Sequence, residues 1–363
     1  MDQRSAAVQG CFLGMAVGDA MGYSVDKKTW PEICEAYGPN GLLGYDLANG
    51  SAEVTSYTQL AAFTANALLL GITRGNPELY SRCLVVAVRE WYKSQQFRSN
   101  TEKTRCWVAQ VPALRRRLCM DTQMLDALSR PTLGTPEAPV FRSITPGALT
   151  AAMAVGVCYD PRRMERSQLL RLGTEAVAFT HGRPETHISG AYLSFVIAQL
   201  LQDTQTSLSE LFTRSLDTIS EMFEQKYPGE LADFCALIRR ALNLTRDLEL
   251  TPLAAMTLLE CTTAAECVAG AVYASAIHPS NFDEAMIVSV NHSGRSCAVG
   301  ALTGAILGAR LGAQALPEFY LESLECAPML AELAQDLVDC RQVSRIFDDS
   351  WDQKYVQGMP VQR

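Results

Sequence analysis

Apolar residues recur at intervals of three and four positions along most of the chain, which is the spacing of one helix face. Alternation of apolar and polar residues, which is typical of half-buried strands, is almost absent, and no short repeat recurs at a solenoid period. We therefore predict an all-α fold. The predicted helices cover residues 6–21, 57–70, 79–92, 107–128, 147–159, 166–180, 184–201, 207–223, 231–244, 264–277, 282–290, 297–312 and 321–338. Residues 131–146, which include four prolines, are predicted to form a long loop.

The predicted helix 297–312 is built mainly from small residues. Glycines occupy every fourth position and therefore share one helix face: Gly300, Gly304, Gly308 and Gly312. Each costs a helix about 0.5–1 kcal/mol relative to alanine, a loss that close packing of another backbone can offset. We expect this helix at the centre of the fold. The polar turn before it, residues 291–296, offers serine caps and free amide groups, which favour an anion or a carboxylate.

Length, net charge and cysteine distribution limit the kinds of protein and of partner that are compatible with the sequence. The 363 residues can bury a sizeable core, and the net charge of -8 argues against a nucleic-acid partner or an anionic membrane surface. The 12 cysteines are scattered without a C-x-x-C pair, which predicts reduced thiols and a cytoplasmic location. No secretory signal is convincing, and Arg310 interrupts the apolar helix before it reaches the length of a membrane span. We predict one domain over residues 1–340 and a C-terminal tail over 341–363.

Four segments resemble the motifs of one family, the ADP-ribosylglycohydrolases, which include dinitrogenase-reductase-activating and ADP-ribosylarginine hydrolases. They are GCFLGMAVGDAMGYSVD (10–26), VTSYTQLAAFTANALLLGITRG (54–75), AVAFTHGRPETHISGAY (176–192) and NFDEAMIVSVNHSGRSCAVGALTGAILGARLG (281–312). Their order spans most of the chain. The resemblance implies a compact orthogonal bundle of many helices around a polar cleft. It also implies hydrolysis of an N- or O-glycosidic bond at the ribose C1 of ADP-ribose by means of two Mg²⁺ ions.

The positions that hold the metal ions in this family have changed. Where the family reads Ser/Thr-Asp-Asp, this chain has Thr55, Ser56 and Tyr57. Where it reads Asp-Ser-Asp, the two Asp positions hold Arg295 and Cys297, and the acid of the first loop corresponds to Asp26. An inward-pointing Arg295 about 4 Å from a divalent ion would repel it by roughly 8 kcal/mol at an effective dielectric near 20. We therefore predict that the magnesium pair does not form and that no metal is bound there.

The resemblance also outlines a candidate ligand-binding cleft. Its residues are Thr55, Ser56, Tyr57, Gly147, His181, Ser293, Gly294, Arg295, Ser296 and Cys297. Gly147 matches a family loop whose arginine is here a small residue. The fixed charge of Arg295 is suited to phosphate or ribose oxygens, and Tyr57 to stacking on a base or ribose. His181 keeps its Thr-His-x-x-Pro setting, although a single histidine on an apolar helix is more often a hydrogen-bonded core residue.

Three functions are compatible with the sequence. We rank first a protein that binds ADP-ribose, or a related nucleotide or ribosyl ligand, without metal and without hydrolysis. A scaffold that has lost its ligand is the second, and no protein partner is identifiable. The third is an active hydrolase of ADP-ribosylated proteins or of small ADP-ribose conjugates. Outside the metal route, Cys297 at a helix N-terminus beside Arg295 would have a lowered pKa and act as nucleophile, with Asp26 as the catalytic acid or base.

Overall fold

The computed structural model describes residues 2–96, 104–340 and 349–355. Within these ranges it contains seventeen α-helices, four short 3-10 helices and no strand, so the predicted all-α class is confirmed. The α-helices are α1 (Gln3–Tyr23), α2 (Trp30–Tyr37), α3 (Ser56–Thr73), α4 (Tyr80–Ser94), α5 (Thr122–Ser129), α6 (Leu149–Cys158), α7 (Arg166–Ala178), α8 (Pro184–Leu200), α9 (Leu208–Phe223), α10 (Pro228–Leu244), α11 (Pro252–Leu259), α12 (Ala264–Ile277), α13 (Phe282–Val290), α14 (Ser296–Leu311), α15 (Glu318–Ser323), α16 (Ala327–Asp339) and α17 (Asp349–Tyr355). None of these helices combines the length and the hydropathy needed to cross a membrane.

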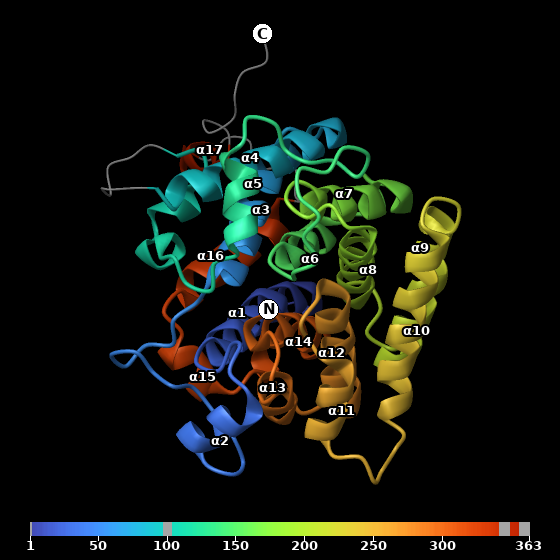
Figure 1. Cartoon of the computed structure of the whole chain (residues 1–363). Coiled ribbons are helices and arrows are strands. Elements are labelled where there is room, and N and C mark those ends of the chain that lie inside the picture. Colours follow the sequence, from blue (N-terminus) through green and yellow to red (C-terminus); the bar gives the residue numbers. More distant parts are fainter. Residues whose placement is uncertain (1, 97–103, 341–348, 356–363) are drawn as a thin grey trace.

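The helices α1 and α14 form the centre of the fold, with the other helices arranged around them (Figure 1). The glycine face of α14 packs against α1, which also carries a glycine at every fourth position: Gly10, Gly14, Gly18 and Gly22. A Cβ added at Gly304 would lie 1.9 Å from the carbonyl oxygen of Gly14. The two backbones therefore touch along the whole contact, as expected from the glycine spacing of α14.

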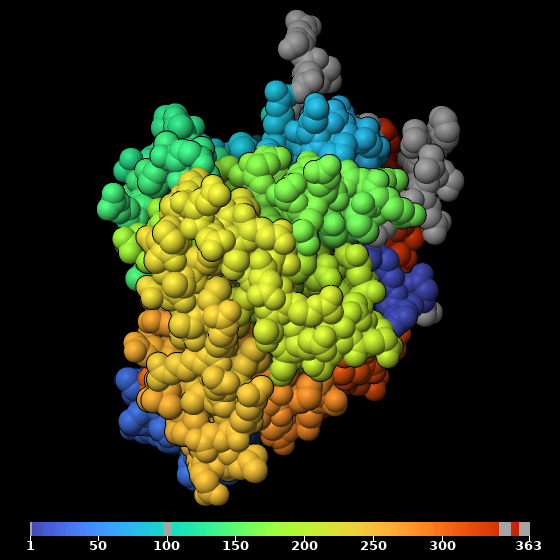
Figure 2. Space-filling view, turned by 90° about the vertical axis from the view of Figure 1, so that its right-hand side faces the viewer, coloured from blue at the N-terminus to red at the C-terminus, as the bar shows by residue number. Residues whose placement is uncertain are grey.

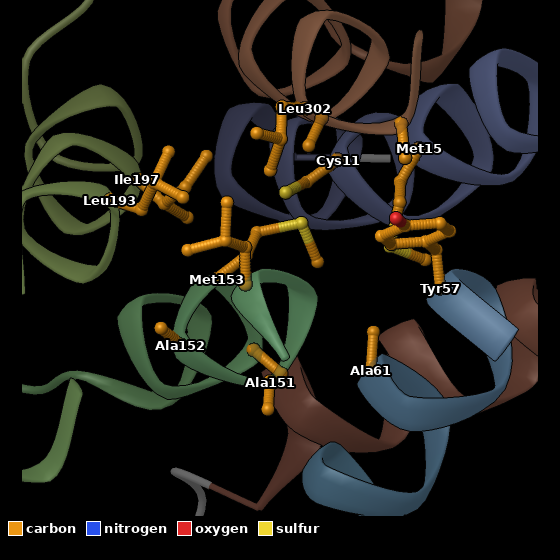
Figure 3. Packing of buried hydrophobic residues seen from close by; sticks show 14 of the residues in the cluster. Cys11, Met15, Tyr57, Ala61, Ala151, Ala152, Met153, Leu193, Ile197 and Leu302 are labelled. Atoms are coloured by element: carbon orange, nitrogen blue, oxygen red, sulfur yellow. The ribbon is translucent and has the colours of Figure 1, made fainter. Parts of the chain in front are cut away.

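Larger side chains pack outward from this central pair. Figure 3 shows Met153 of α6 between Cys11 and Leu302 of the central helices and Leu193 and Ile197 of α8. On the outside, α9 and α10 form much of the face shown in Figure 2, in lime to golden yellow. Both are amphipathic helices that bury one stripe, which agrees with their expected outer position.

The predicted helix 107–128 is wrong. Two 3-10 helices, Trp107–Gln110 and Pro112–Arg115, occupy its first part, and α5 its last. Pro112 has no amide hydrogen for an α-helical bond and favours a break at this point. Arg116, which follows the second 3-10 helix, forms ion pairs with Glu53 and Glu325.

The C-terminal part of the chain differs from the prediction in two ways. The predicted helix 321–338 is divided into α15 and α16, and Ala52 forms an isolated β-bridge with Leu324 between them. In the predicted tail, α17 is ordered against the domain. Its Trp351 Nε1 donates a hydrogen bond to Thr73 Oγ1 at 3.1 Å, and the hydroxyl of Tyr355 to Asp336 Oδ2 at 2.8 Å. The remainder of the tail, 341–348 and 356–363, lies outside the described residues. The helices α2 and α11 were not predicted.

Candidate ligand-binding site

The end of α1 meets the beginning of α14, because the two helices are antiparallel and closely packed. A Cβ added at Gly22 would lie 2.6 Å from the backbone nitrogen of Cys297. The loop that follows α1 carries Asp26, whose Oδ1 accepts a hydrogen bond from that nitrogen at 3.2 Å. The backbone nitrogen of Lys27 donates to the carbonyl of Gly294 at 3.1 Å. Asp26 therefore satisfies a free amide of the first turn of α14 and fixes the loop against it.

Asp26 lies beside two thiols. The Sγ of Cys119 is 3.7 Å from Asp26 Oδ2 and 3.1 Å from the Sγ of Cys297. Over the described residues, these three form the one group of metal-ligating side chains whose donor atoms all lie within 4.8 Å of one another. Cys297 is fully buried, whereas Asp26 and Cys119 are partly exposed. Cys119 was not among the predicted site residues, because its segment was expected to be helical and it meets Cys297 only through the fold.

Ser56 holds the segment that carries Cys119. Its backbone nitrogen donates to the carbonyl of Leu118 at 3.1 Å, and its hydroxyl donates to the carbonyl of Cys119 at 2.9 Å. Cys119 adopts a φ of 48°, in the left-handed region, which costs a non-glycine residue about 1–2 kcal/mol. Thus the residue that replaces a family aspartate positions a thiol of this chain.

Thr55 is held by a buried carboxylate to which sequence analysis gave no role. Asp19 accepts hydrogen bonds from the hydroxyls of Thr55 and Thr58, both at 2.6 Å, and from their backbone nitrogens at 2.8 and 3.1 Å. Asp19 is fully buried, and burial raises its pKa to about 6 in spite of these four bonds. Asp19 therefore attaches the start of α3 to α1.

The raised pKa of Asp19 predicts a pH dependence of stability. The pKa of Asp19 is about 3.8 in the unfolded chain and about 6 in the fold, so the folded protein binds this proton more tightly. The resulting contribution to the free energy of unfolding is fully present below pH 4 and is lost as the pH rises through 6. The change amounts to about 3 kcal/mol. In Asp19→Asn the amide stays neutral, its oxygen accepts from both backbone nitrogens, and its nitrogen donates to the Thr55 hydroxyl. The free energy of unfolding of this variant minus that of the wild type, from urea titrations at several pH values, should increase between pH 4 and 6.5. A constant difference would contradict the raised pKa.

Two expectations about individual side chains are wrong. Tyr57 is only 4% exposed, and Figure 3 shows its ring next to Met15 in the core, so it presents no face for stacking on a ligand. Burial raises the pKa of the Cys297 thiol well above its usual range, and the contacts with Cys119 and Asp26 raise it further. Both effects disfavour the thiolate, which is the nucleophilic form, so they act against the lowered pKa that the helix position of Cys297 suggested.

His181 is a hydrogen-bonded core residue. It is fully buried, with Nδ1 2.7 Å from the Thr180 hydroxyl and Nε2 2.9 Å from the Thr145 hydroxyl. The Thr145 hydroxyl also donates to Asp121, which caps α5 through the amides of Gln123 and Met124. Burial would raise the pKa of Asp121, but hydrogen bonds from His181 and Thr145 outweigh it and hold that pKa well below its usual range. Gly147 lies against this group, since a Cβ there would be 3.1 Å from Asp121 Oδ2.

The turn before α14 is tightly held by its neighbours. The hydroxyl of Ser293 accepts a hydrogen bond from the backbone nitrogen of Trp30 at 2.8 Å, at the start of α2. Gly294 packs against Cys261, whose carbonyl oxygen would be 2.5 Å from an added Cβ. The hydroxyl of Ser296 donates to the carbonyl of Val290 at 2.8 Å and is fully buried.

Arg295 is the charged residue of this turn. Its backbone nitrogen donates to the carbonyl of Cys261 at 2.8 Å. Its side chain is partly exposed, and it forms no hydrogen bond or ion pair with any residue that the structure describes. Burial raises the pKa of Asp26, but the charge of Arg295 opposes this shift, which places the guanidinium within electrostatic reach of the carboxylate. Of the predicted cleft residues, 293–297 form the turn and the first residues of α14, and Ser56 is joined to them through Cys119. Gly147 and His181 gather around Asp121 instead, and only Ser293 and Arg295 of the whole set reach the surface.

The donor set at this place differs from that expected for magnesium. Mg²⁺ prefers octahedral oxygen ligands, above all carboxylates and water. The hydroxyls of Thr55 and Ser56 are engaged by Asp19 and by the Cys119 carbonyl, and Tyr57 is in the core. Asp26 is the one carboxylate beside the thiols in the group described above. Two thiols and one carboxylate do not fit a pair of hard cations.

Comparisons with known proteins agree with the sequence motifs. A family described as ADP-ribosylglycohydrolase matches residues 1–346. No curated protein sequence matches the chain. A solved structure described as "ADP-ribosylglycohydrolase-related protein complex" is similar with a TM-score of 0.60 and 23% sequence identity, over 94% of this chain and 99% of that chain. At this identity the likeness shows the fold, whereas the match to the family covers nearly all of the sequence. The chain belongs to the ADP-ribosylglycohydrolase family.

Proposed function

We propose that this family member binds ADP-ribose, or a related nucleotide or ribosyl ligand, without a magnesium pair and does not hydrolyse it. The observation that carries the proposal is the partly exposed guanidinium of Arg295, which has no ion-pair partner in the described part of the chain. It stands at the N-terminus of the central helix α14, where backbone amides and the helix dipole also favour anions.

The donor set in the same place supports the proposal that hydrolysis is absent. The family reaction depends on two Mg²⁺ ions that activate water and hold the reacting oxygens. Here the positions that would supply carboxylates hold Ser56, Tyr57, Arg295 and Cys297. Asp26 remains available for proton transfer, but its Oδ1 is engaged by the amide of Cys297. Binding through Arg295 requires neither a metal ion nor a nucleophile.

We expect ADP-ribose at 100 times its dissociation constant to stabilise the protein by roughly 2.7 kcal/mol, a rise of a few degrees in melting temperature. The rise should be unchanged by Mg²⁺ or by EDTA. Arg295→Ala should weaken binding by about 10- to 100-fold, because a hydrogen bond to a charged group contributes roughly 1.5–3 kcal/mol. Calorimetric titration measures both affinities.

Arg240→Ala is the matched control, since Arg240 lies exposed on the outer helix α10. It should bind ADP-ribose like the wild type. Equal affinity of wild type and Arg295→Ala would refute the assigned role of Arg295. A stabilisation that requires Mg²⁺, with release of free ADP-ribose from an arginine-linked conjugate, would instead show an active hydrolase. An absence of any binding would favour a scaffold.

A further inference from the structure

The thiols of Cys119 and Cys297 and the carboxylate of Asp26 form a group to which the proposed function gives no joint role. Asp26 and Cys297 stand at positions where the family carries acids, whereas Cys119 lies outside the four motif segments. Cys119 comes from the segment before α5, Cys297 from the first turn of α14, and Asp26 from the loop after α1. We propose that these three side chains bind a thiophilic divalent cation of the zinc class.

The distances between the donor atoms suit such an ion. Zinc binds sulfur at about 2.3 Å and carboxylate oxygen at about 2.0–2.2 Å, so two ligands of a tetrahedral site lie roughly 3.5–3.8 Å apart. Cys119 Sγ lies 3.7 Å from Asp26 Oδ2 and 3.1 Å from Cys297 Sγ. The sulfur–oxygen separation is already that of a zinc site, and a rotation of one thiol by about 0.7 Å would give the two sulfurs the separation of zinc-bound thiolates. The third pair, Cys297 and Asp26, has its donor atoms within 4.8 Å.

The surroundings hold each donor in place. The backbone nitrogen of Cys297 occupies Asp26 Oδ1, which leaves Oδ2 turned toward Cys119. Ser56 holds the carbonyl of Cys119, whose left-handed backbone directs the thiol inward to Cys297. Outer partners of this kind orient the ligands in established metal sites. The left-handed backbone of Cys119 is a strained conformation, and such strain is found more often at functional sites than elsewhere in proteins.

The charges balance when the ion is bound. Each thiol releases its proton to solvent on binding, so two thiolates and one carboxylate carry three negative charges against two positive ones. The charge of Arg295, which acts on Asp26, was expected to repel a divalent ion here, but three negative ligand charges exceed it. The proposal therefore departs from the expectation from sequence that no metal is bound at this place. Since Asp26 and Cys119 are partly exposed, water from solvent can supply the fourth ligand that a tetrahedral ion needs.

This inference goes beyond the proposed function, and the two can fail separately. The cation site is tested without any nucleotide, and ADP-ribose binding through Arg295 is tested with the cation removed.

The experiment uses the full chain, freed of metal by a chelator and kept reduced by a phosphine, and titrates it with Co²⁺ as a spectroscopic substitute for zinc. We expect one equivalent of Co²⁺ to produce the near-ultraviolet thiolate charge-transfer band and the strong visible bands of tetrahedral cobalt. One equivalent of Zn²⁺ should remove these bands, whereas excess Mg²⁺ should not, because Mg²⁺ does not compete for thiolates. Two protons per ion should appear in the medium.

Cys119→Ser tests the site with little risk to folding, because Cys119 is partly exposed and lies outside any helix. Cys297→Ser tests it at the buried thiol, and circular dichroism checks that each variant is folded. Each should lower Co²⁺ affinity by at least the 10- to 100-fold that loss of an outer partner causes. Cys34→Ser, at another partly exposed cysteine on α2, should bind like the wild type. Cobalt bands that persist at unchanged affinity in both site variants, or no bands in the reduced wild type, would overturn the proposal.

Discussion

Gly304→Ala is expected to abolish folding or to lower the free energy of unfolding by about 4 kcal/mol or more, at the extreme of single substitutions. The new Cβ would lie 1.9 Å from the carbonyl oxygen and 2.6 Å from the carbonyl carbon of Gly14. No flexible side chain can move away, because both atoms belong to the backbone of α1. The only relief is a separation of the two central helices, which would loosen every layer packed around them.

Gly229→Ala is the matched control for this substitution. Gly229 lies in the first turn of α10, and nothing stands within 4 Å of an added Cβ. Replacement there should leave the protein unchanged or stabilise it by up to about 1 kcal/mol, because alanine favours the helix. Chemical denaturation of both variants measures the difference. Similar stabilities for the two would show that the central helices are not in backbone contact.

Asp19→Ala is expected to lower the free energy of unfolding by about 3–5 kcal/mol, because it removes the acceptor of two buried amides and two buried hydroxyls, each costing roughly 1–3 kcal/mol when unsatisfied. The hydroxyls of Thr55 and Thr58 can turn toward other acceptors, but the two amides cannot. Asp19→Asn is the control, since it keeps an acceptor in place. We expect urea unfolding at pH 7 to rank the asparagine variant at least level with the wild type and the alanine variant far below it. Equal losses in both variants would show that the charge, and not the hydrogen bonding, is what matters.

The parts of the fold that could be predicted from sequence depend on local regularity. The glycines of α14 identify a helix in backbone contact with another, because a period of four is visible within the segment itself. The same period in α1 was not used, although Gly10, Gly14, Gly18 and Gly22 form the other half of the contact. Helical boundaries from α6 to α10 agree within a few residues for the same reason.

The candidate site was less predictable, because it depends on contacts between distant segments. Cys119 and Cys297 are 178 positions apart in the sequence. They meet because the segment after Pro112 does not form the α-helix that its composition suggested. The pKa of Cys297 was expected to fall because only the helix start and Arg295 were considered, but complete burial decides its direction. His181 behaved as isolated core histidines usually do, bonded through both ring nitrogens.

The pairing of α1 with α14 also has a consequence for synthesis of the chain. About 270 residues separate the end of α1 from the start of α14, so at roughly 5–20 residues per second the ribosome needs about 14–54 s to synthesise α14 after α1. Throughout that interval the glycine face of α1 lacks α14, the helix that covers it in the folded protein. The nascent chain is therefore expected to need a chaperone, and any product that stops before α14 to be degraded and not to accumulate as a smaller folded protein.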